Sequence, residues 1–175
     1  QPSIQIRSDI VIDGCYFTND RDATSNSALV ATIESEPFEV TLRNCIFAPK
    51  HDVLPYIDLR LDGVTATIAN CQFYHQGSGA VLALGRGLAN VTTIDNCLFY
   101  VRPDDASQAI ALEIDNGRTT VTNCRFHGRA PADRGVILCK NTNGTLGNDA
   151  ALALQNCTFQ GISGGSLLYV EEGAG

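Results

Sequence analysis

The chain has 175 residues, of which 44% are hydrophobic, so it is long enough for one packed domain and too apolar to be intrinsically disordered. Its 19 acidic residues outnumber its 12 basic residues, and no basic run could neutralise a row of phosphates. We therefore expect no nucleic-acid partner, and no membrane insertion, because no apolar stretch is long enough to span a bilayer. We treat residues 1–175 as a single domain, and the start at Gln1 rather than methionine indicates a domain or mature fragment of a longer protein.

A repeat built around cysteine and phenylalanine runs through the chain. Six copies of the pattern Cys-x-Phe occur, and successive copies lie 26 to 33 residues apart. The six cysteines are Cys15, Cys45, Cys71, Cys97, Cys124 and Cys157. The six phenylalanines are Phe17, Phe47, Phe73, Phe99, Phe126 and Phe159. Because the copies use six of the seven cysteines and six of the seven phenylalanines, we infer that this repeat organises the fold.

An asparagine precedes the cysteine in five copies, and Gly14 stands there in the first. An aliphatic residue lies two positions before it, and apolar and variable positions alternate on both sides, which is the period of a β-strand. Asn and Gly best tolerate the left-handed αL conformation, so each copy is predicted to place a tight bend between two strands. The asparagines at these bends are Asn44, Asn70, Asn96, Asn123 and Asn156.

A third strand is expected in every repeat, because a further β-rich apolar run occurs in each one. These runs span residues 4–6, 28–33, 56–61, 80–84, 109–114, 136–139 and 167–170. Three short strands per repeat, without helical periodicity, predict an all-β fold: a right-handed parallel β-helix of about six coils. In this fold every repeated position becomes a column along the solenoid, so we expect an asparagine ladder at the bends and stacks of Phe and Cys inside.

The repeated hydrophobic-x-Asn-Cys-x-Phe pattern resembles the pectate-lyase-like right-handed β-helix superfamily over nearly the whole chain. The resemblance implies the fold, but its members include polysaccharide lyases and hydrolases, epimerases, tailspikes, adhesins and non-catalytic modules of larger bacterial proteins. Three functions therefore stay open. The first is a non-catalytic scaffold that binds a glycan or a protein, the second is a small carbohydrate-active enzyme, and the third is a sensory or regulatory module fused to a signalling enzyme.

The seven cysteines are expected to be buried free thiols. Cysteines of successive coils are expected to lie one strand spacing apart, so their Cβ atoms are farther apart than a relaxed disulfide requires. The chain also has no Cys-x-x-Cys pair for a zinc site. No cofactor is therefore expected, except that a lyase could use Ca²⁺ held by acidic residues. Buried thiols neither require nor exclude an extracellular location, so the compartment stays open.

The resemblance implies that an enzyme would hold its substrate on the outer face of the first strand of each coil. A hydrolase would use Asp104 or Asp105 as the general acid, with Asp58 or Glu113 activating water. A lyase would use a cationic residue as its base, the candidates being Arg60, Lys140 and Arg134. The same mapped outer face includes Val81, Ala83, Ala111, Val136, Leu138, Leu167, Tyr169 and Glu171.

All three histidines fall shortly after a repeat phenylalanine, in segments that the pattern assigns to connections between strands. We predict a binding edge there, with His127 as a further catalytic candidate. The binding candidates are His51, His75, Arg102, Arg134 and Tyr169. The alternative interpretation is that these segments are polar only because they face water. At the ends no capping helix is predicted, so we expect further chain, a neighbouring domain or a subunit to cover the last coil, beside an apolar patch of Val136, Leu138, Leu167 and Tyr169.

Overall fold

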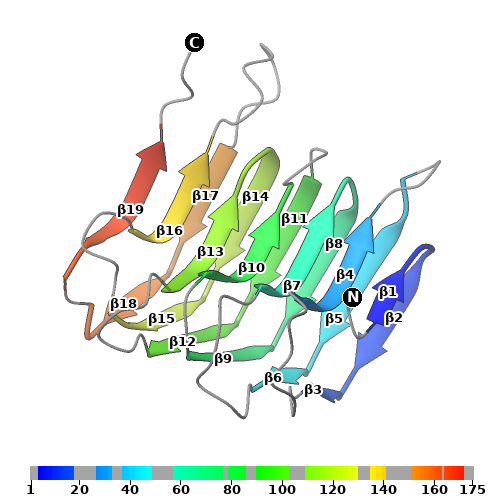
Figure 1. The fold of residues 1–175 in the computed structure, drawn as a ribbon, viewed down its shortest axis with the longest axis horizontal. Helices are drawn as coiled ribbons and strands as arrows, with labels where there is room; N and C mark the ends of the chain where they lie inside the picture. The colour runs from blue at the N-terminus through cyan, green and yellow to red at the C-terminus, as the bar shows by residue number, and fades with distance from the viewer. Residues whose placement is uncertain are drawn as a thin grey trace.

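The computed structural model describes residues 4–17, 27–32, 37–48, 57–76, 79–85, 90–102, 109–129, 135–140, 151–162 and 164–171. These residues form parallel strands and no helix, and successive strands pass in turn through three sheets that lie along one solenoid (Figure 1). The predicted parallel β-helix with three strands per coil is therefore confirmed. Six strands in each of the two shorter sheets match the six copies of the repeat in the described part of the chain.

Each sheet collects one strand type from every coil. Sheet A contains β1 (Ile4–Ile6), β4 (Ser27–Thr32), β7 (Ile57–Asp62), β10 (Gly79–Leu84), β13 (Ala109–Ile114), β16 (Gly135–Lys140) and β19 (Ser166–Glu171). Sheet B contains β2 (Ile10–Asp13), β5 (Glu39–Arg43), β8 (Thr65–Ala69), β11 (Asn90–Asp95), β14 (Gly117–Thr122) and β17 (Ala151–Gln155). Sheet C contains β3 (Tyr16–Phe17), β6 (Ile46–Phe47), β9 (Gln72–Gln76), β12 (Leu98–Arg102), β15 (Arg125–Gly128) and β18 (Thr158–Gln160).

The bends between sheets B and C use the left-handed conformation that the sequence predicts. All five bend asparagines have φ between 50° and 55°, and Gly14 has φ 65°. The bend N–H of one coil also donates to a carbonyl of the next coil, as in the 3.0 Å bond from Asn96 N to Thr122 O. The bend is therefore part of the pairing between coils.

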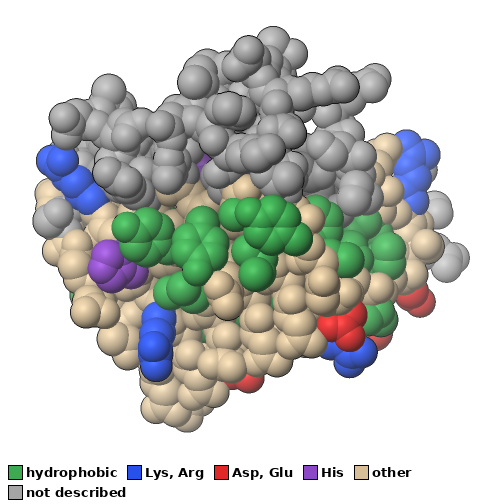
Figure 2. Space-filling view, turned by 90° about the horizontal axis from the view of Figure 1, so that it is seen from below, with side chains coloured by type: hydrophobic (Ala, Val, Ile, Leu, Met, Phe, Trp, Pro, Cys, Tyr) green, Lys and Arg blue, Asp and Glu red, His purple; other side chains and the backbone are tan. Residues whose placement is uncertain are grey.

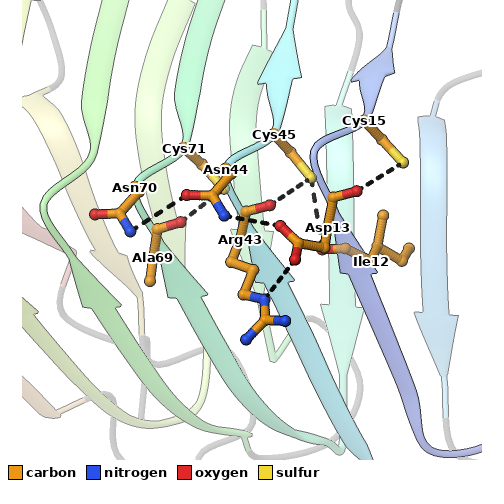
Figure 3. Close-up of polar contacts among 9 residues, drawn as sticks. All are labelled: Ile12, Asp13, Cys15, Arg43, Asn44, Cys45, Ala69, Asn70 and Cys71. Atoms are coloured by element: carbon orange, nitrogen blue, oxygen red, sulfur yellow. Dashed lines mark hydrogen bonds and ion pairs between the residues drawn. The ribbon is translucent and has the colours of Figure 1, made fainter.

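Side-chain hydrogen bonds join Asn44, Asn70 and Asn96 into a ladder, of which Figure 3 shows the part from Asp13 to Asn70. The ladder is interrupted between Asn96 and Asn123, because Asn123 Nδ2 donates to Asp95 Oδ1 at 2.8 Å. Asn96 Nδ2 donates to Asn70 Oδ1 at 2.8 Å, and Asn70 Nδ2 donates to Asn44 Oδ1 at 3.4 Å. In the first coil, where Gly14 has no amide, the Asp13 carboxylate accepts the bond from Asn44 Nδ2 at 2.7 Å. That hydrogen bond is the largest cause of the lowered pKa of Asp13. The ladder asparagines are solvent-exposed, whereas the Phe and Cys residues of the four central repeats are buried.

Six phenylalanine rings form one continuous stack along the interior. Neighbouring ring centroids are 4.6 to 5.0 Å apart, and the ring planes differ by 5° to 10°. The four central rings, Phe47, Phe73, Phe99 and Phe126, are almost completely buried. The stack therefore runs through the hydrophobic core from the first coil to the last described one.

The seven cysteines are free thiols, as predicted, and five of them are buried. Cys15 is exposed and Cys157 is partly exposed, so the expectation of complete burial is wrong at both ends. The reason is that β3 and β18 are the two edge strands of sheet C. In the middle of the column, Cys97 N donates to Cys124 Sγ at 3.3 Å. The side-chain hydrogen bond with Cys124, which favours the protonated Cys97 thiol, is the largest cause of the raised pKa of Cys97.

Candidate functional site

The outer face of sheet A, where an enzyme would be expected to hold its substrate, is buried at its centre. Ala83 and Leu138 belong to a small apolar cluster that is separate from the main core, together with Ala80 and Ile110. On the same face Glu113 is only 3% exposed. Its Oε1 lies 3.4 Å from Lys140 Nζ, and these two side chains are 4% and 19% exposed. This part of sheet A therefore presents no open row of charged groups to a polysaccharide.

The prediction of which residues lie on the outer face of sheet A is partly wrong. Val81, Ala111 and Val136 pack into the main core instead of pointing outward. Leu82, the residue after Val81, packs into the same core, so two consecutive side chains face inward. Inward and outward side chains therefore do not alternate strictly at this position of the strand. The prediction of the outer face from every second residue fails there.

The described residues do not assemble the candidate catalytic groups into one site. Asp104, Asp105, Arg134 and His51 lie outside the described residues. Asp58 and Arg60 lie on β7 and Arg102 ends β12, but the positions of these three side chains are not described. Glu113, Lys140 and His127 remain. Glu113 and Lys140 form an ion pair with each other, whereas His127 lies on a different sheet, on β15 of sheet C. Within the described ranges no group of three or more His, Cys, Asp or Glu side chains could hold a metal ion.

Two of the histidines lie on strands rather than in connections, because β9 continues to Gln76 and β15 continues to Gly128. The alternation of a strand then places them on opposite faces. His75 is 1% exposed, so a ligand on the surface cannot reach its ring. His127 is partly exposed on the outer face of sheet C.

The outer face of sheet C carries a row of aromatic rings, which we call the aromatic row: Tyr74, Tyr100 and His127. Strand pairing places the three residues side by side on β9, β12 and β15, and all three are partly exposed. The Tyr100 and His127 rings are parallel, with centroids 5.0 Å apart and an interplanar angle of 7°. The Tyr74 and Tyr100 rings are 6.0 Å apart and tilted by 44°. Tyr74 Oη donates to Gln72 Oε1 at 2.9 Å, which fixes one end of the row.

The residues beside the aromatic row are apolar, amide or basic. Gln72, Leu98 and Arg125 pair with one another two positions earlier on the same strands. Figure 2 shows this face, with hydrophobic side chains in a line, a histidine at one end and basic side chains nearby. Acidic side chains appear below the line, one of them beside a basic side chain, and at the edges of the view. The row is thus an amphipathic surface strip on a rigid sheet.

The sequence interpretation missed Tyr74, Tyr100 and Arg125 as members of one surface. A signal for them was present in the repeat itself. The position after the repeat phenylalanine holds an aromatic residue in three consecutive copies, Tyr74, Tyr100 and His127, and an outward column at that position follows from the alternation of the strand.

Tyr169, the remaining binding candidate, lies on β19 at the edge of sheet A and is 41% exposed. Leu167 beside it is also exposed. The expected apolar patch is only half correct, because its other two members, Val136 and Leu138, are 4% and 1% exposed. Pairing with β19 on one side of β16 contributes to their burial.

The three-sheet solenoid with its stacked Phe column and asparagine ladder is the architecture of a parallel β-helix protein. A family model described as the right handed beta helix region matches residues 57–172, so the chain belongs to this family. No curated protein and no solved structure matches the chain. Among the described residues no helix is long and apolar enough to cross a membrane.

Proposed function

We propose that this chain is a non-catalytic β-helix scaffold whose outer face of sheet C binds a glycan or a protein ligand. The observation that carries the proposal is the aromatic row, three partly exposed rings held side by side on consecutive strands. Binding sites on regular strands are more precise than sites on loops, because the backbone fixes where each side chain starts.

The interior supports this role because it makes the face rigid. Phe73, Phe99 and Phe126 stack directly beneath the strands of the aromatic row, with centroids 4.8 to 4.9 Å apart. Each of these rings precedes a member of the row in the sequence, so the buried and exposed columns share the same backbone. A ligand would therefore meet a surface that is ordered before it binds, which lowers the entropic cost of binding.

The surroundings of Glu113 favour a scaffold over an enzyme. A general acid or base must reach the substrate within hydrogen-bond distance. Glu113 is buried and ion-paired with Lys140, so solvent does not reach it as it reaches the aromatic row. We interpret this pair as a contact that joins β13 to β16.

The test is a search for turnover on uronate-rich and neutral polysaccharides, with and without Ca²⁺. We expect the wild-type protein to release neither reducing ends nor unsaturated uronates. Reproducible turnover that disappears when Asp104→Ala, Asp105→Ala and Glu113→Gln are combined would contradict the scaffold proposal. Thermal unfolding of the triple variant checks that the loss does not come from misfolding.

A further inference from the structure

The six repeat cysteines form a column of thiols, which we call the thiol column, at the bends between sheets B and C. Each Sγ donates to the carbonyl oxygen two residues before it, at 3.1 to 3.6 Å. From the second coil on, the same contact with a carbonyl of the preceding coil recurs, as between Cys45 Sγ and Ile12 O at 3.6 Å. The thiols therefore share one orientation, which Figure 3 shows for Cys15 and Cys45, and neighbouring sulfurs are separated by the strand spacing of about 4.8 Å.

This spacing suits a metal ion placed between two successive thiolates. A zinc–thiolate bond is about 2.3 Å long, and two collinear bonds of that length join sulfurs about 4.6 Å apart. The backbone already holds the sulfurs near that separation, so binding needs little movement of the coils. Zinc and iron–sulfur clusters take four protein ligands, whereas the thiol column offers an ion one sulfur on either side. Copper(I), a soft ion that prefers thiolates and accepts linear coordination by two ligands, meets both conditions.

The two ends of the thiol column are where an ion can enter. Cys15 is exposed and Cys157 is partly exposed, whereas the four thiols between them are buried. Each end cysteine precedes an edge strand, and these strands are short: β3 pairs with β6 through two residues, and β18 pairs with β15 through three. Short edge strands open locally at a low free-energy cost. A copper(I) ion between two thiolates carries one net negative charge, which an apolar core accommodates poorly, so the ends are also favoured over the interior.

We propose that each end of the thiol column binds one copper(I) ion, held between Cys15 and Cys45 at one end and between Cys124 and Cys157 at the other. Binding replaces two S–H bonds with two S–Cu bonds and releases two protons, and the copper keeps its oxidation state. The backbone N–H of Cys97 already donates to Cys124 Sγ at 3.3 Å, so the bound thiolate keeps a hydrogen bond that stabilises its charge. This site is separate from the ligand-binding face of sheet C.

The experiment is an anaerobic titration of the reduced protein, with all seven thiols free, against the copper(I) complex of the chelator bicinchoninate. We expect the wild type to withdraw two copper ions per chain, Cys15→Ala and Cys157→Ala one each, and the double variant none. Cys139→Ala is the matched control, because Cys139 is a buried thiol on β16 whose partners in the neighbouring coils are Ile114 and Val170. It should leave both ions bound.

Two further measurements test the geometry and the folded state. X-ray absorption should show two sulfur neighbours for each copper ion in the wild type. Copper(I) should raise the melting temperature of the wild type and leave that of the double variant unchanged, because an ion that binds the folded chain stabilises it. A lower melting temperature with copper would instead show that the unfolded chain binds it, and this would overturn the proposal.

Three outcomes of the titration and the absorption measurement would also overturn the proposal. The first is that the wild type withdraws no copper from bicinchoninate. The second is equal uptake by the wild type and the double variant, or loss of uptake in Cys139→Ala. The third is three or four sulfur neighbours per copper ion, because the thiol column offers only two. None of these outcomes affects the function proposed for sheet C, so the two proposals fail separately.

Discussion

Replacing Phe99 with alanine is expected to lower the free energy of unfolding by about 3–5 kcal/mol, the cost of a cavity left by a large core side chain. Phe99 is completely buried, and its ring has stacked neighbours on both sides, Phe73 at 4.8 Å and Phe126 at 4.9 Å. The backbone pairing of β12 with β9 and β15 prevents the coils from closing the gap. Urea denaturation monitored by circular dichroism measures the loss.

Phe17→Ala provides the matched control for that substitution. Phe17 lies at the edge of the stack, is only partly buried, and has one ring neighbour, Phe47 at 4.6 Å. Its replacement should therefore cost clearly less than the replacement of Phe99. Equal losses at the two positions would argue against a continuous stack as the main source of core stability.

Gly117→Ala is expected to destabilise the protein by about 3 kcal/mol or more, because it combines backbone strain with overlap against a fixed neighbour. Gly117 has φ 97°, a conformation that alanine rarely adopts. A Cβ added there would overlap the backbone carbonyl oxygen and nitrogen of Asn90 in the preceding coil. Relief would require separating β14 from β11, which pair along their whole length. The loss is measured by the same denaturation.

Gly14→Ala separates the cost of backbone strain from the cost of steric overlap. Gly14 also has positive φ, at 65°, but a Cβ there would have no neighbouring atom within 4 Å. Only the left-handed strain remains, which costs an alanine about 1–2 kcal/mol. If both substitutions cost the same, close packing of the coils at Gly117 would not be the cause.

Much of the fold could be predicted because each coil repeats the same physical requirements. A single Asn-Cys-x-Phe segment is weak evidence, but six copies identify the bend, the buried thiol and the buried ring as columns. The bends at Asn70 and Asn96 and the stacking of Phe73 on Phe99 follow directly from that repetition.

The bends between sheets A and B were missed because their asparagines occur in too few copies. Asn90 and Asn116 are buried there, and each side-chain amide donates to a carbonyl of the preceding coil at 2.9 Å. The first bond ends on Leu61 O and the second on Gly85 O. These amides satisfy backbone groups that would otherwise be buried without partners, which is the role expected of the exposed ladder.

The candidate site was harder to predict than the fold. Strand β10 of sheet A is apolar on both faces, as parallel strands often are, so its sequence does not show that the alternation stops at Val81. The sequence also does not show where β9 and β15 end. His75 and His127 were therefore predicted to lie in connections, although both lie on strands, with His75 buried and His127 partly exposed. Residues of different coils can be assigned to one surface only when the register between their strands is known.

The central claim is that ligands bind on the outer face of sheet C and not on that of sheet A. Photo-crosslinking with a diazirine-labelled galacturonate oligomer, followed by peptide mass spectrometry, tests it most directly. We predict adducts on β9, β12 and β15, at or next to Tyr74, Tyr100 and Arg125, and their suppression by unlabelled polygalacturonate. Competed adducts on β13 and β16 around Glu113 and Lys140, or adducts spread evenly over the solenoid, would contradict the claim.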